Sequence, residues 1–97
     1  SIMSQLKEES TMVGAFSTFS CNIDDQANNA FNEAFEGFVG VKYAPVAVSQ
    51  QVVAGMNYRF FCNSKMVTPF SVNGSAMVSI YKPLNGNAHI MSIQNID

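Results

Sequence analysis

Few residues in this chain have types and spacing that could support catalysis. Asp24 and Asp25 form a carboxylate pair suited to acid–base work, and Cys62 with His89, the only histidine, could supply a thiol and an imidazole. We expect neither role. The aspartates stand where a helix begins, which favours capping, and Cys62 lies among apolar residues, which raise the pKa of a thiol and make it inert. His89, just before a strand, is typical of a surface residue.

The remaining chemistry-bearing motifs are also missing from the sequence. There is no Gly-x-Ser-x-Gly elbow, no phosphate-binding loop and no dinucleotide fingerprint. Cys21 and Cys62 lack the spacing of a zinc site, so we expect no metal and no cofactor. We expect two free, buried thiols, and a single disulfide is the alternative. An enzyme is therefore the least favoured of the functions considered below.

The composition restricts the class of protein further. A chain of 97 residues suits one domain, and 47% of its residues are hydrophobic. Only 12% are charged, about half the usual share of a soluble domain. The net charge is −2 and the five basic residues are scattered, which argues against nucleic acid as a partner. No apolar run approaches the roughly 20 residues that span a bilayer, so we expect no membrane partner.

The beginning of the chain leaves its compartment open. Residues 1–11 are polar and show no period, which predicts a flexible arm before a single domain at 12–97. If Ser1-Ile2 is an artificial extension before a true start at Met3, the protein is cytoplasmic; if it is a mature end left by processing, the protein is secreted. We expect the first.

One segment, residues 22–40, predicts a long α-helix. Asp24 and Asp25 supply cap and dipole chemistry at its start, and Gly37 or Gly40 can end it. Apolar residues recur there at helical spacing and form a single stripe: Ala27, Ala30, Phe31, Ala34, Phe35 and Phe38. A helix with one apolar stripe has one sheet face to cover.

The rest of the chain has the period of β-strands. We expect a short first strand within 12–21 and four more strands at 41–50, 56–63, 75–82 and 88–96. Pro45 predicts an edge or a bulge, residues 64–74 a connection that crosses outside the main ladder, and Asn85-Gly86 a tight turn. In 56–63, Tyr58, Phe60 and Cys62 share one face. The fold class is α+β: a four- to five-stranded antiparallel sheet wrapped around one long helix.

The connection "QVVAG", residues 51–55, does not fit the usual chemistry of a hairpin. Hairpin turns are polar and favour Asn-Gly or Gly-Gly, whereas this stretch is mostly aliphatic. It is either an ordinary strand or loop with buried valines, or an apolar surface with a function.

The same stretch carries a resemblance to a known family. Gln51, Val53 and Gly55 match the QxVxG signature of the cystatins, and Asn57-Tyr58 extends the match to the VVAGxNY of stefin-type members. "MVGAFS" at 12–17 resembles the N-terminal glycine segment of stefins, and "YKPLNG" at 81–86 stands where the second binding hairpin of the family lies. The resemblance covers about residues 12–96.

The resemblance implies a cystatin-like fold and a reversible, competitive inhibitor of papain-like cysteine proteases. Three segments of the family form a wedge that fills the active-site cleft. Carried over to this chain, the protease-binding residues are Met12, Val13 and Gly14, then Gln51, Val52, Val53, Ala54 and Gly55, then Pro83, Leu84 and Asn85. We expect Gly55→Glu to weaken inhibition without unfolding the domain, because it would place a charge at the tip.

Some features depart from the family and leave alternatives open. Pro83-Leu84 replaces the Pro-Trp of secreted members, whose C-terminal cysteine pairs are also absent. The connection at 64–75 is longer than in stefins, and no role is assigned to it. We expect a monomer, with a domain-swapped dimer as the alternative. The rival function is a non-inhibitory protein-binding module on the same fold.

Overall fold

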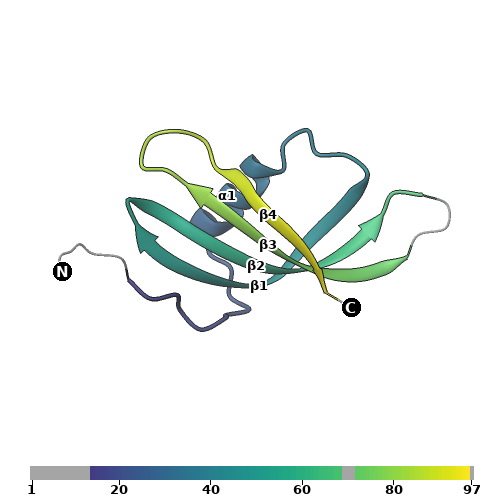
Figure 1. Cartoon of the computed structure of the whole chain (residues 1–97), viewed down its shortest axis with the longest axis horizontal. Coiled ribbons are helices and arrows are strands. Elements are labelled where there is room, and N and C mark those ends of the chain that lie inside the picture. Colours follow the sequence, from purple (N-terminus) through teal and green to yellow (C-terminus); the bar gives the residue numbers. More distant parts are fainter. Residues whose placement is uncertain (1–13, 69–71, 97) are drawn as a thin grey trace.

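The part of the chain that the structure describes folds into one helix and one antiparallel sheet (Figure 1). The structure is a computed structural model that describes residues 14–68 and 72–96. The helix α1 spans Asp25–Ala34 and is followed by β1 (Val41–Val53), β2 (Gly55–Met66), β3 (Asn73–Lys82) and β4 (His89–Ile96). The sheet order is β1-β2-β3-β4, so the α+β prediction is confirmed, with four strands. Within the described ranges, no helix is long and apolar enough to cross a membrane.

The helix begins as predicted but is shorter than predicted. The Asp24 side chain accepts a hydrogen bond from the Ala27 N–H at 2.9 Å, which caps the first turn. The helix ends at Ala34, because the chain turns through Phe35 and reaches Gly37 with φ +79°, a left-handed conformation that suits glycine. Phe38 therefore lies outside the helix with 42% of its surface exposed, although its ring still packs against Phe35.

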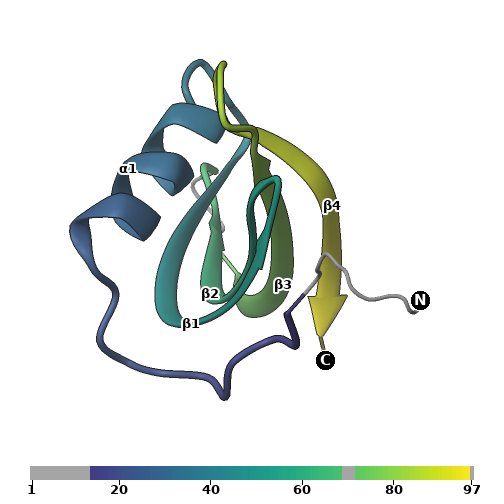
Figure 2. The same ribbon diagram turned by 90° about the vertical axis from the view of Figure 1, so that its left-hand side faces the viewer.

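The core lies between α1 and the concave face of the sheet. Figure 2 shows the strands curving around the helix, which lies along one side of them. Tyr58, Phe60 and Cys62 all point inward and are at most 2% exposed, as their alternation predicts. The ring of Phe31 meets that of Phe60 edge to face at 5.0 Å between centroids. This contact fixes the helix over the middle of β2.

The proline in β1 behaves as the sequence predicts. β1 is an edge strand, and its register with β2 shifts between Pro45 and Ala47. Proline has no N–H to donate to the neighbouring strand, so it is tolerated at a bulge in an edge strand, where no ladder hydrogen bond is required.

The predicted first strand is wrong. Residues 14–20 follow β1 and bond to it through Gly14, Ser17 and Ser20, whose partners are Val52, Gln50 and Val48. Successive hydrogen bonds are three residues apart in this segment but two residues apart in β1. The two backbones therefore form no regular ladder, and one isolated bridge remains at Ser20. Phe16 anchors the segment across the sheet, with the Arg59 guanidinium 3.7 Å above its ring.

Two other connections also differ from prediction. The predicted crossing segment at 64–74 is part of a hairpin, because β2 continues to Met66 and Lys65 pairs with Asn73 of β3. Asn85-Gly86 does not make a tight two-residue turn. β3 ends at Lys82 and β4 begins at His89, which leaves a six-residue loop, 83–88. Pro83 cannot continue the ladder, and the loop is held by groups from outside it.

Candidate functional site

The "QVVAG" stretch forms the tip of the β1–β2 hairpin. Val53 of β1 pairs with Gly55 of β2, and Ala54 alone stands between the strands. Val52 is 62% exposed and Ala54 is exposed, whereas Val53 is half-buried. Alternation along the strand turns Val53 toward the opposite face, so Val52 and Ala54 are the exposed aliphatic side chains of the tip.

Gly55 is a structural requirement of the hairpin rather than part of its surface. It is buried and has φ +108°, a conformation that other residues rarely adopt. A Cβ there would lie 2.2 Å from the Lys82 carbonyl oxygen and 3.0 Å from Pro83 Cα. This close approach argues against the expectation that Gly55→Glu leaves the domain intact, since a side chain at this position would push the hairpin away from β3.

Gly14 lies directly beside the hairpin. Its N–H donates to the Val52 carbonyl at 3.3 Å, and its own carbonyl accepts from Gln51 Nε2 at 2.9 Å. Asn57 Nδ2 in turn donates to Gln51 Oε1 at 2.9 Å, which fixes the orientation of the amide. Gln51 thus acts inside the protein, joining the hairpin to the N-terminal segment. Met12 and Val13, the other predicted residues of this segment, lie outside the described residues.

The third predicted segment lies on the other side of the hairpin. Pro83 is half-buried, Asn85 is exposed and Leu84 is 75% exposed. The close approach of Gly55 to Lys82 and Pro83 joins this loop to the hairpin. Gly14, residues 51–55 and residues 83–85 therefore meet at one end of the molecule, which we call the hairpin end; it lies at the left of Figure 1.

An open groove lies between α1 and the hairpin end. Its volume is about 640 Å³, and its walls include Ala30 and Glu33 from the helix, Met56 from the hairpin and Leu84 from the loop. The groove contains both apolar and hydrogen-bonding groups, but within the described ranges no cluster of His, Cys, Asp and Glu could hold a metal ion.

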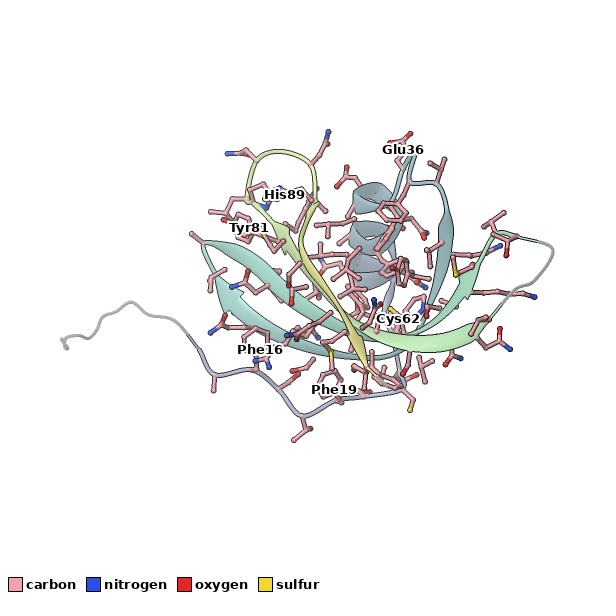
Figure 3. All side chains as sticks on the ribbon, turned by 45° about the vertical axis from the view of Figure 1, so that its right-hand side comes forward. Phe16, Phe19, Glu36, Cys62, Tyr81 and His89 are labelled. Carbon is pink, nitrogen blue, oxygen red and sulfur yellow. The ribbon has the colours of Figure 1, made fainter. Side chains whose placement is uncertain are left out.

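The candidate catalytic residues do not come together. Cys62 is fully buried, and burial raises the pKa of its thiol to about 12, so it stays protonated. Cys62 pairs with Ala76 of β3 while His89 pairs with Tyr81, and five residues of strand separate these positions by about 16 Å. Figure 3 shows the two side chains well apart. A Cys62–His89 pair is thereby excluded.

The two cysteines are free, as expected, but only one is buried. Cys21 is exposed, which contradicts the expectation of two buried thiols. It follows the irregular segment beside β1, where no second layer covers it.

Sequence reasoning missed several residues that hold the hairpin end together. The Tyr81 hydroxyl donates to the carbonyl of Ala54 at the tip, and its ring packs edge to face against His89. Lys82 and Glu33 hold the loop, through contacts described below. The sequence marks Asn57 only as part of the VVAGxNY motif. No local pattern points to Tyr81, Lys82 or Glu33, because the bonds that join Tyr81 to Ala54, Lys82 to Glu33 and Glu33 to Ala88 span 27 to 55 residues of sequence.

Comparison with known proteins identifies no relative: no protein-family model, no curated protein and no solved structure matches this chain.

Proposed function

We propose that this chain is a cystatin-like protein that inhibits papain-like cysteine proteases reversibly and competitively. The hairpin end would enter the active-site cleft as a wedge, with Gly14, the Gln51–Gly55 hairpin and the Pro83–Asn85 loop in contact with the protease. The proposal assigns the chain no catalytic role.

One observation carries the proposal: Gly14, residues 51–55 and residues 83–85, which are far apart in sequence, meet at one end, where the last two segments each expose an aliphatic side chain. Val52 and Leu84 are 62% and 75% exposed, and both line the same groove beside α1. Both can supply apolar anchors to the walls of a cleft. Hydrogen bonds from Gln51 to Gly14 and from Tyr81 to Ala54 hold the hairpin in place, so it would lose little ordering entropy on association.

A non-inhibitory binding module is the second candidate, and the groove beside α1 favours it. A hollow of about 640 Å³ with apolar and polar walls is typical of sites for a small ligand or a short peptide. In that case the ligand would lie against Ala30 and Met56 rather than cover the tip of the hairpin.

For the compartment we propose the cytoplasm. Cys21 is an exposed free thiol, which suits a reducing environment better than an oxidising one.

The proposal is tested by assaying papain with a fluorogenic substrate while the protein is added. We expect the apparent KM for the substrate to rise with inhibitor concentration while kcat stays constant, as competition for the cleft requires. Trypsin serves as the class control and should be unaffected, because its cleft has a different shape and nucleophile. A fall in kcat at constant KM would place the binding site outside the active-site cleft and contradict competitive inhibition, whereas unchanged papain activity would favour the binding module.

A further inference from the structure

The loop at 83–88 lacks the support that a strand ladder gives. The ladder between β3 and β4 ends at the pair of Tyr81 and His89, and the ladder between β2 and β3 ends at Lys82, so residues 83–88 have no cross-strand partner. Leu84, with 75% of its surface exposed, gains little from packing against the core. Its position therefore depends on whatever holds the backbone on either side of it.

One carboxylate of α1 supplies that support. Glu33 Oε1 accepts a hydrogen bond from the Ala88 N–H at 2.7 Å, at the end of the loop. The same oxygen lies 3.0 Å from Lys82 Nζ, at the start of the loop, in an ion pair. Lys82 Nζ also donates to the Gly86 carbonyl at 2.8 Å. Glu33 thus ties both ends of the loop to the helix, and Lys82 ties its middle.

The hydrogen bonds that Glu33 accepts favour its ionised form. The Ala88 N–H bond and then Lys82 hold the pKa of Glu33 below its usual value. A charged acceptor makes both bonds stronger than a neutral one would. Ala88 is only 5% exposed, so its N–H has little access to water if the carboxylate is removed.

We propose that Glu33 is a positioning residue for inhibition, which holds the Pro83–Ala88 loop so that Leu84 is presented beside the QVVAG hairpin. The effect of Glu33 on inhibition rests on the proposed function, whereas its effect on the position of the loop does not. Glu33 itself does not need to touch the protease. Glu33 affects protease binding by fixing the position of the loop, and so the position of Leu84.

The geometry is tested by hydrogen exchange, without any protease. In Glu33→Ala the Ala88 amide should exchange at least about tenfold faster, the size expected for losing a charge-assisted bond. The Val78 amide, in the core of β3, should keep its rate and so report that the domain has not unfolded. Glu33→Gln should show a smaller acceleration, because its amide oxygen can still accept from Ala88.

The matched control for exchange is Glu36→Gln. Glu36 lies one turn further along the chain, is exposed and points away from the loop (Figure 3). This variant should exchange like the wild type. The inference is overturned if Glu33→Ala leaves the Ala88 rate unchanged, or if Val78 accelerates as much as Ala88.

The consequence for inhibition is tested by a double-mutant cycle. Glu33→Ala and Leu84→Ala should each weaken papain inhibition about tenfold, and the double variant should be no weaker than Leu84→Ala alone. Additive losses, about a hundredfold in the double variant, would show that Glu33 acts by another route and would overturn the inference. If the wild type fails to inhibit papain, the proposed function fails, and the exchange result alone decides whether Glu33 positions the loop.

Discussion

Both ends of the molecule expose aliphatic side chains, yet they are built differently. At the hairpin end, Val52 and Leu84 are 62% and 75% exposed. At the far end, formed by the α1–β1 and β2–β3 connections, the corresponding values are 85% for Val39, 70% for Val67 and 67% for Val72. Exposed apolar surface by itself therefore does not identify the functional end.

The difference lies in how the segments are held. At the hairpin end, side chains join separate segments: Gln51 bonds to Gly14, Tyr81 to Ala54 and Glu33 to Ala88. At the far end, within the described ranges, the two connections share one backbone bond, from the Val67 N–H to the Gly40 carbonyl at 3.0 Å. The hairpin end is thus ordered before any partner arrives, and a preorganised surface loses less entropy on binding.

The largest difference between the two ends is expected in the free energy of unfolding when a glycine with positive φ is replaced by alanine. Gly55→Ala should reduce the free energy of unfolding by about 3 kcal/mol or more, because backbone strain adds to the 2.2 Å approach to the Lys82 oxygen. Gly40→Ala at the far end, with φ +98° and no atom within 4 Å, should lose about 1 kcal/mol. Urea unfolding of both variants measures this, and equal losses would contradict the close packing of the hairpin end.

A smaller but more specific effect should separate two exposed valines. Val52→Glu should weaken papain inhibition by about 3 kcal/mol, roughly a hundredfold, because the cleft would have to bury a charge. Val67→Glu, at a site of similar exposure on the far end, should inhibit like the wild type. Inhibition constants of the two variants give the answer, and equal behaviour would remove the functional distinction between the two ends.

The smallest effect is expected at Gly14. A Cβ there would meet only the Val52 oxygen at 3.9 Å, an ordinary contact. Gly14→Ala should therefore change the free energy of unfolding by less than about 0.5 kcal/mol. Any loss of papain inhibition by this variant would then arise in the complex. A loss of stability above about 1 kcal/mol would show that the N-terminal segment is packed more tightly than its contacts indicate.

Local patterns in the sequence were sufficient for much of the fold. The Asp24 cap, the inward face of Tyr58, Phe60 and Cys62, and the bulge at Pro45 each follow from spacing or from the chemistry of one residue type. These features depend on neighbours within a few positions, which periodicity can detect.

The errors occur where distant partners decide the outcome. The segment at 14–20 is not a strand because its hydrogen bonds to β1 are three residues apart in the segment but two residues apart in β1. The 83–88 loop is longer than a tight turn and is tied by Glu33, which is 55 positions from Ala88 in the chain. The candidate site was proposed from a resemblance to a family. Its three segments do lie together, but Tyr81, Lys82 and Glu33 needed the structure.

The most direct test of the central claim is a stoichiometric titration of active papain. With the enzyme well above the inhibition constant, residual activity should fall linearly and reach zero at one equivalent of the protein. Leu84→Ala should weaken that binding without changing the end point. If activity is unchanged at micromolar concentrations of the wild-type protein, the hairpin end does not fill a papain-like cleft and the proposed function is wrong.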